Sequence, residues 1–532
     1  MACVGVVARL ALQGSYLARQ GPKFEDIRER RGQSMSNNTE DAVFLGASVK
    51  KEQLLLRLAN RHGLITGATG TGKTVSLQII AEGLSAKGVP VFAADVKGDL
   101  AGLAAAGVSK PFLEERAAKI GFTDYSYRAF PVIFWDLFGE QGHPIRATVK
   151  EMGPLLLSRL LELNDVQEGV LNIAFRVAAD DKLPLIDLRD LRSLIAHVAE
   201  RADQLSRNYG NVSKSSVGAL QRRLLVLEEQ AAAHFFGEPA FDIQDLMRTD
   251  ANGHGYIGVL AADRLMTTPR LYSSFLLWLL SALFDKLPEV GDPPKPKLVF
   301  FFDEAHLLFE EAPKALLERI ERIARLIRSK GVGVYFVTQN PLDVPDSVSS
   351  QLGNRIQHAL RAYTPREQRA VKAAAETFRP NPEFNAERVI LELGVGEALV
   401  STLEAKGEPS VVQRTLIRPP ASRLGPLTAE ERRAVIALSP VKGVYDKALD
   451  RESAHEMLNK GPDARGGATD DGFERHGEFR VPKMPDGASG APRDRPSARD
   501  NVTDAFFKSL ARSVASAIPR IIERVLRSRY RR

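Results

Sequence analysis

The chain has 532 residues, 44% of them hydrophobic, which is enough to bury a large core divided among two or three domains. Its single cysteine, Cys3, excludes an intrachain disulfide and a cysteine-based metal site and suits a reducing cytosol, so we expect a cytoplasmic protein. The net charge of +7 is concentrated in residues 501–532, where eight basic residues outnumber two acidic ones, so the nearly neutral body carries no charge signature of DNA binding.

Neither a membrane span nor a targeting segment is predicted. The longest apolar run, Leu271 to Phe284, has fourteen residues, which is too short to cross a bilayer and indicates a buried helix. Residues 1–34 contain several acids and no long apolar core, unlike a transit or signal peptide. Because Met35 is a plausible alternative start, we treat residues 1–34 as a possible extension or mis-assigned start and leave them out of the fold.

Residues 35–149 are expected to form the first part of an α/β core. Residues 37–61 are expected to end in a mostly helical segment. The first predicted strand follows it, from His62 to Thr66. Apolar runs at 89–95 and 131–137 predict further strands, with helical stretches between them. Short apolar strands that alternate with helices are typical of a parallel sheet covered on both faces.

A phosphate-binding loop with the pattern G-x-x-x-x-G-K-T follows the first strand. It consists of Gly67, Ala68, Thr69, Gly70, Thr71, Gly72, Lys73 and Thr74. Glycines let the backbone curl so that N–H groups face an anion, and the next helix adds its N-terminal dipole. The Lys73 ammonium can reach the β and γ phosphates, and the Thr74 hydroxyl can bind Mg²⁺. The alternative is a plain glycine-rich turn between strand and helix.

Residues 150–250 change character and predict an all-helical insertion. Apolar residues recur at helical spacing, and no strand pattern appears, in the stretches 155–163, 166–177, 188–198 and 217–229. The core then resumes in residues 251–420. Its predicted strands are 255–261, 298–302, 332–338, 355–361 and 397–402, and helices are predicted at 271–284 and 315–330.

Two acids, Asp303 and Glu304, follow the buried strand 298–302, at the edge where open α/β sheets bind ligands. In a phosphoryl-transfer site the first acid holds the Mg²⁺ shell and the second polarises the attacking water. Gln339 follows the strand 332–338, and its amide could face the γ-phosphate or that water. The alternative for Gln339 is a strand-ending cap on the following Asn340-Pro341 loop.

These motifs together resemble the HerA/FtsK superfamily of P-loop ATPases, in particular the bacterial HerA-like helicase C-terminal family. The resemblance rests on the phosphate loop, the Asp303-Glu304-Ala305-His306 sequence, and the helix end 325–331 that precedes a strand closing in Thr-Gln-Asn-Pro. It runs from about Met35 to Pro420 and includes the basic C-terminal segment. It implies a RecA-like core that hydrolyses ATP with Mg²⁺, usually as a ring with active sites between subunits.

The resemblance also implies roles for single residues. Lys73 and Thr74 match the Walker A pair, Asp303 and Glu304 match the Walker B pair, and Gln339 matches the polar sensor.

Arg328 matches the position of an arginine finger that acts on a neighbour's nucleotide, and Arg325 shares its helix face. The alternative is a cation near a helix C-terminus that pairs with the dipole or with Glu321. HerA proper carries a β-barrel ahead of its phosphate loop, whereas the 66 residues before Gly67 show no run of alternating strands. Functions that the barrel houses are therefore not expected from these residues.

For DNA contact the sequence offers Arg207 to Ser216, which includes Lys214, followed by Arg222 and Arg223. Cations and small polar residues at a helix start suit a phosphate backbone, but an ordinary turn with an N-cap explains them equally. His306 is expected to be a packed or capping histidine rather than a ligand.

Three segments complete the chain: a helical extension at 421–460, a Gly/Pro-rich linker expected to be disordered at 461–500, and a basic amphipathic helix at 501–532 interrupted at Pro519. The last segment could contact an anionic membrane, a protein groove or nucleic acid, or be a solvated helix.

The sequence therefore predicts an α/β, RecA-like P-loop NTPase with a mostly parallel, doubly wound sheet and a helical insertion. The predicted function is ATP hydrolysis coupled to DNA translocation or remodelling, as a homohexamer. The alternative is a nucleotide-dependent switch or scaffold that recruits a protein or membrane through its C-terminal helix.

Overall fold

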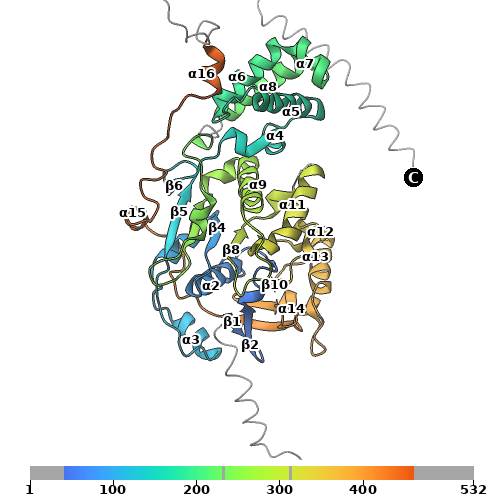
Figure 1. The fold of residues 1–532 in the computed structure, drawn as a ribbon. Helices are drawn as coiled ribbons and strands as arrows, with labels where there is room; N and C mark the ends of the chain where they lie inside the picture. Colours follow the sequence, from blue (N-terminus) through green and yellow to red (C-terminus); the bar gives the residue numbers. More distant parts are fainter. Residues whose placement is uncertain (1–40, 230–233, 311–313, 461–532) are drawn as a thin grey trace, which may run out of the picture. The chain divides into compact units, whose positions relative to one another are not determined.

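The computed structural model describes residues 41–229, 234–310 and 314–460 (Figure 1). The predictions for residues 1–34, 461–500 and 501–532 lie outside this part of the chain. The strands are β1 (Ala42–Ala47), β2 (Lys51–Leu55), β3 (Gly63–Thr66), β4 (Val91–Asp95), β5 (Val132–Asp136), β6 (His143–Pro144), β7 (Ile257–Ala261), β8 (Leu298–Phe302), β9 (Val332–Thr338), β10 (Asn354–Gln357), β11 (Glu397–Ser401) and β12 (Gln413–Ile417).

The α-helices are α2 (Lys73–Ala86), α3 (Pro111–Lys119), α4 (Val149–Leu160), α5 (Asp165–Asp180), α6 (Leu188–Glu200), α7 (Ala202–Tyr209), α8 (Lys214–Glu229), α9 (Pro269–Lys286), α10 (His306–Phe309), α11 (Lys314–Leu326), α12 (Asp346–Ser349), α13 (Pro365–Glu376), α14 (Ala386–Glu392), α15 (Ala429–Ala437) and α16 (Ala454–Asn459). The 3₁₀ turn used below is η6 (Ile327–Lys330). None of the helices in the described ranges is long and apolar enough to cross a membrane.

The strands form one mostly parallel sheet in the order β2-β1-β12-β11-β10-β3-β9-β8-β4-β7-β5-β6. Pairing is parallel from β10 to β6 and antiparallel from β2 to β10. This confirms the predicted mostly parallel α/β fold. It also places β9 between the strand before the phosphate loop, β3, and the strand before the two acids, β8.

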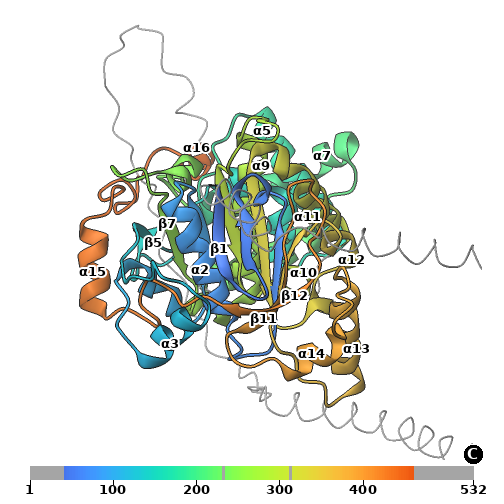
Figure 2. The same cartoon turned by 90° about the horizontal axis from the view of Figure 1, so that it is seen from below.

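Side chains of the central strands alternate between two hydrophobic cores, because successive residues of a strand point to opposite faces. Phe300 and Phe302 of β8 lie in one core together with Trp278 of α9. Val299 and Phe301 lie in the other core together with residues of α2. The sheet is thus covered by α9 and α11 on one face and by α2 on the other (Figure 2).

The prediction of a mostly helical segment within residues 37–61 was wrong, because this stretch forms the hairpin of β1 and β2. Val43 and Leu45 of β1 are buried two residues apart, which is the period of a strand, not of a helix. The hairpin joins the sheet through β12, where Gly46 pairs with Ile417. That partner strand is some 370 residues further along the chain and was also not predicted, so tertiary pairing decided the local structure.

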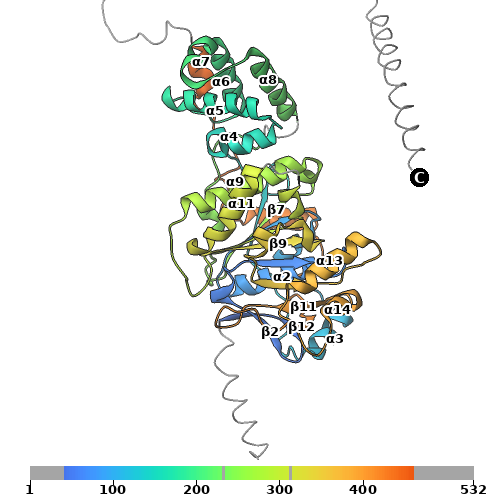
Figure 3. The ribbon, with the colours of Figure 1, turned by 90° about the vertical axis from the view of Figure 1, so that its right-hand side faces the viewer.

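All described elements between residues 149 and 229 are helices, as the spacing predicts. α5 packs against α6 and α8, and α4 packs against both α5 and α9 of the core (Figures 1 and 3). α4 bends at Gly153, whose φ of 71° leaves the helical region, and Pro154 follows it. The exact insertion boundaries at 150 and 250 stay a prediction.

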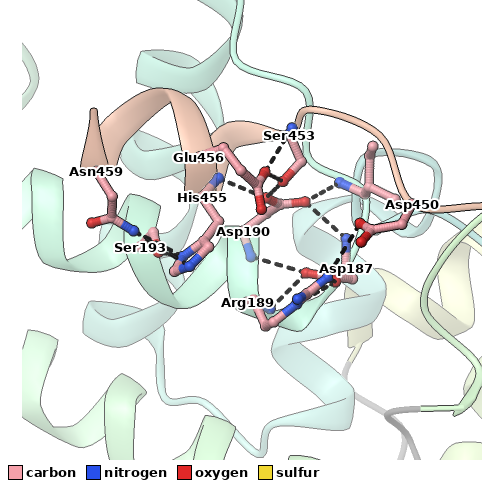
Figure 4. Close-up of polar contacts among 10 residues, drawn as sticks. Asp187, Arg189, Asp190, Ser193, Asp450, Ser453, His455, Glu456 and Asn459 are labelled. Carbon is pink, nitrogen blue, oxygen red and sulfur yellow. Dashed lines mark hydrogen bonds and ion pairs between the residues drawn. The ribbon is translucent and has the colours of Figure 1, made fainter.

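The predicted helical extension at 421–460 contains only two short helices, α15 and α16, joined by non-helical chain. α16 docks on α6 through the buried Asp190 (Figure 4). The Asp190 carboxylate accepts hydrogen bonds from the Ser453 hydroxyl and the His455 backbone N–H, over 2.5 and 2.8 Å. It also accepts from the backbone N–H groups of Ile186 and Asp187, over 2.7 and 3.0 Å, so one carboxylate joins two helix starts.

Candidate nucleotide-binding site

The phosphate loop connects the end of β3 to the start of α2 in a backbone form that requires glycine. Gly67, Gly70 and Gly72 have φ values of 150°, 79° and 116°. A Cβ atom on Gly67 would lie 2.5 Å from the Cβ atom of His358. The backbone N–H groups of Gly70 and Gly72 make no hydrogen bond with any residue in the described ranges, so they are available to an anion.

Lys73 folds over this loop. Its Nζ donates to the backbone oxygens of Gly67 and Ala68, over 2.6 and 3.3 Å. Burial lowers the pKa of Lys73, while the negative charges of Glu304 and Asp303 oppose this shift. The Lys73 ammonium therefore interacts electrostatically with both acids, although they are some 230 residues away in sequence.

The two acids follow β8 at the carboxyl edge of the sheet, and both are largely buried. Glu304 adopts a left-handed φ of 49°, and its backbone N–H donates to Asp303 Oδ1 over 3.0 Å. Burial raises the pKa of Asp303 to about 7, and the nearby Glu304 charge adds to this shift. The Tyr272 hydroxyl of α9 donates to the Asp303 backbone oxygen over 2.8 Å and fixes the strand end.

The structure brings Gln339 to Glu304, because the strands that precede them, β9 and β8, are neighbours in the sheet. The Gln339 amide donates to Glu304 Oε1 and Oε2 over 3.2 and 3.1 Å. His306 begins α10, and its Nδ1 lies 3.5 Å from Glu304 Oε2; that it packs or caps rather than binds a ligand stays a prediction. These three polar side chains line up at the ends of β8 and β9.

His358 packs against the phosphate loop beside Gly67, and the sequence did not predict this role. It is fully buried, and its Nδ1 lies 2.9 Å from the Glu397 backbone oxygen. A carbonyl only accepts, so Nδ1 carries the proton and Nε2 accepts from the Ser76 hydroxyl of α2, over 2.8 Å. No local motif marks this histidine, since its partners are brought together by folding.

Arg328 does not join the cluster. It lies in η6 at the start of β9, whereas Gln339 follows the end of that seven-residue strand, about 23 Å further along. Its Nε is 4.0 Å from Asp292 Oδ1. The pairing with Glu321, which was the alternative given for Arg328, is made by Arg325 instead, over 3.0 Å.

The candidate DNA segment lies on α7, on α8 and in the turn between them. The Ser213 hydroxyl accepts from the Ser216 N–H over 3.1 Å, which is the ordinary N-cap. Arg207 donates to its own helix at the Asp203 oxygen, and Arg223 pairs with Glu162 over 3.0 Å. Binding of DNA by this segment stays a prediction.

The residues present fit a nucleotide with Mg²⁺. The loop offers unpaired amides and a lysine for phosphate, and the Thr74 hydroxyl and the Asp303 carboxylate are the hard oxygen donors that Mg²⁺ prefers. A family model for the helicase HerA-like C-terminal family matches residues 43–531. The chain belongs to this family. The HerA-like protein is accordingly a P-loop ATPase, as its motifs predict.

Several solved structures are similar to this HerA-like ATPase. The bacterial conjugative coupling protein TrwB has 17% identity, a TM-score of 0.45, and coverage of 73% of this chain and 92% of that chain. TrwB in complex with ADP and Mg²⁺ has 18% identity, a TM-score of 0.42, and coverage of 69% and 89%. VirB4 of Thermoanaerobacter pseudethanolicus has 13% identity, a TM-score of 0.46, and coverage of 74% and 98%. None of the curated proteins matches the chain.

Proposed function

We propose that this HerA-like ATPase binds ATP and Mg²⁺ at the loop of residues 67–74 and couples hydrolysis to translocation or remodelling of DNA as a homohexameric ring. The observation that carries the proposal is the Glu304 carboxylate, held by Gln339 at the same edge of the sheet as the phosphate loop. A carboxylate fixed in this way is suited to act on water beside a bound triphosphate.

Each side chain then has a distinct role. Lys73 leaves the loop oxygens that it contacts here and binds the β and γ phosphates. Glu304 polarises the attacking water, and Gln339 orients the Glu304 carboxylate and senses the γ-phosphate. Bound Mg²⁺, held by Thr74 and Asp303 together with phosphate oxygens, would offset the charge that develops on the transferred phosphoryl group.

A ring is proposed because Arg328 lies at the opposite edge of the sheet from Glu304. An arginine finger at this position can reach a phosphate only in a neighbouring subunit, and head-to-tail contacts of this kind close into rings. The exposed part of the Arg328 side chain, 43%, leaves its guanidinium accessible to such a neighbour.

The decisive experiment measures ATP hydrolysis of the full chain with and without single-stranded or duplex DNA, together with its mass in solution. We expect hydrolysis to rise several-fold with DNA and the mass to be that of a hexamer. Glu304→Gln is the control, because it keeps the shape of the site but removes the carboxylate that polarises water.

Hydrolysis that is abolished by Glu304→Gln but indifferent to both kinds of DNA would contradict the motor. It would favour the alternative function, a nucleotide-dependent switch or scaffold. Hydrolysis that survives Glu304→Gln would contradict the assignment of the site itself.

A further inference from the structure

Arg159 connects the helical insertion to the segment that follows the two acids. It lies near the end of α4, and its Nη1 and Nη2 donate to the backbone oxygens of Leu308 and Leu307, over 3.3 and 3.2 Å. Both oxygens belong to α10, a helix of four residues that begins two residues after Glu304. The last carbonyl groups of a helix have no partner within it. A cation that donates hydrogen bonds to these carbonyl groups therefore caps the helix.

Glu304 depends on its neighbours for its position because its left-handed φ of 49° is unfavourable for a residue with a side chain. Residues 303–309 are held by contacts from three elements, which are β9, α9 and α4. The Ala305 N–H donates to the Val337 oxygen of β9 over 3.0 Å, and Tyr272 of α9 holds the Asp303 oxygen. Arg159 is the contact that comes from the insertion.

The end of α4 is itself firmly tied. Glu162, three residues after Arg159, pairs with Arg223 of α8 and with Arg270 of α9. Arg159 is half-buried, and burial together with the nearby Arg270 lowers its pKa to about 10, so it remains charged at neutral pH. A cavity of about 540 Å³ borders this contact and is lined by Arg159, Arg270, Glu162 and Glu310.

We propose that Arg159 is a positioning residue, through which the helical insertion sets the orientation of Glu304 for hydrolysis. Movement of α4 changes the two hydrogen bonds to α10, and α10 carries the movement to the adjacent Glu304 and its bond with Gln339. A ligand that engages the insertion can thereby accelerate or slow hydrolysis. The inference rests on the proposed role of Glu304 in polarising water.

The test compares Arg159→Ala with Arg192→Ala in the full-length protein. Arg192 is the matched control, because it pairs with Glu228 over 3.2 Å between α6 and α8, within the insertion and away from α10. We expect Arg159→Ala to lower kcat for ATP about ten- to a hundred-fold, as small misplacements of a catalytic group do, with KM and the Kd for ATP changed less than about two-fold. Arg192→Ala should keep wild-type values.

Hydrogen exchange supplies a readout that does not depend on turnover. The amides of Leu307, Leu308 and Glu310 bond within and beside α10, and they should exchange faster in Arg159→Ala but not in Arg192→Ala. If Arg159→Ala fails to fold, Arg159→Lys replaces it, because an ammonium keeps the charge but cannot donate in the same fork. It should show an intermediate loss of kcat.

Wild-type kcat in a folded Arg159 variant would overturn the proposal. Equal losses in Arg159→Ala and Arg192→Ala would also overturn it, since they would indicate general loosening of the insertion. Hydrolysis that persists in Glu304→Gln would instead overturn the proposed function, whatever Arg159 does.

Discussion

The Gln339 amide donates to both carboxylate oxygens of Glu304, over 3.2 and 3.1 Å. The two residues follow neighbouring parallel strands, β9 and β8, in which Phe336 pairs with Phe302. Their contact therefore follows from strand order and register. It fixes the carboxylate that the proposed mechanism places beside water.

Removing this contact should impair turnover more than binding. In Gln339→Ala the Glu304 carboxylate loses its two hydrogen bonds and its orientation, so we expect kcat to fall roughly ten- to a hundred-fold while the Kd for ATP changes little. Steady-state kinetics and equilibrium binding measure the two quantities. An unchanged kcat would show that the amide is only a strand cap.

Lys73→Ala should abolish nucleotide binding, turnover or both. The variant lacks the ammonium that lies over the loop oxygens and is expected to bind phosphate, so the Kd for ATP should rise at least about ten-fold. Lys119→Ala, at the exposed end of α3, is the matched control and should bind ATP normally. Full ATPase activity in Lys73→Ala would rule out this loop as the site.

Arg328→Ala and Glu304→Gln should complement each other when mixed. Each pure protein is expected to be inactive, but in a mixed ring about a quarter of the interfaces would combine an intact Glu304 with an intact Arg328 from the neighbour. ATP hydrolysis of the mixture, measured against the sum of the two parents, reports this recovery. A ring of correct mass that recovers nothing would count against a finger in trans.

Acidification should destabilise the protein through its buried histidines. Burial lowers the pKa of His358 from 6.5 to about 4, and His62 is shifted in the same way. Between these values the unfolded chain binds the proton and the folded chain does not. Stability is therefore lost as pH falls from 6.5 towards 4, by about 2 kcal/mol for each histidine at pH 5, and is unaffected above 6.5.

His358→Gln tests this dependence. Urea unfolding at pH 7 and pH 5 should show a smaller loss of free energy in the variant than in the wild type, by about 2 kcal/mol. Equal losses in both proteins would mean that His358 does not stay neutral in the folded state.

Asp190 should matter more for stability than Asp187, although both start the same helix. Asp190→Ala leaves the backbone N–H groups of His455, Ile186 and Asp187 without their acceptor, which costs roughly 3 kcal/mol. Asp187→Ala removes a more exposed N-cap worth about 1 kcal/mol. Unfolding free energies of the two variants decide the order, and equal costs would contradict a structural role for the α16 contact.

The sequence predicted the elements whose pattern is local and strong. The strands β8 and β9 have the bounds that their apolar runs indicated, and the buried run 271–284 lies inside α9. The loop 67–74 could be recognised because its function depends on spacing within eight residues. By contrast, β2 and β12 are mixed in polarity. Both pair with distant or neighbouring strands in the sheet, β2 with β1 and β12 with β1 and β11.

What the sequence alone determined is therefore the chemistry available: a loop for phosphate, two acids after a buried strand, and an amide after another. The tertiary structure decided which of these groups meet. It placed β9 between β3 and β8, so that Gln339 reaches Glu304, and it set Arg328 at the opposite edge. It also brought Arg159 to α10, 148 residues further along the chain. Such contacts depend on the packing of distant segments, which no local pattern of residues encodes.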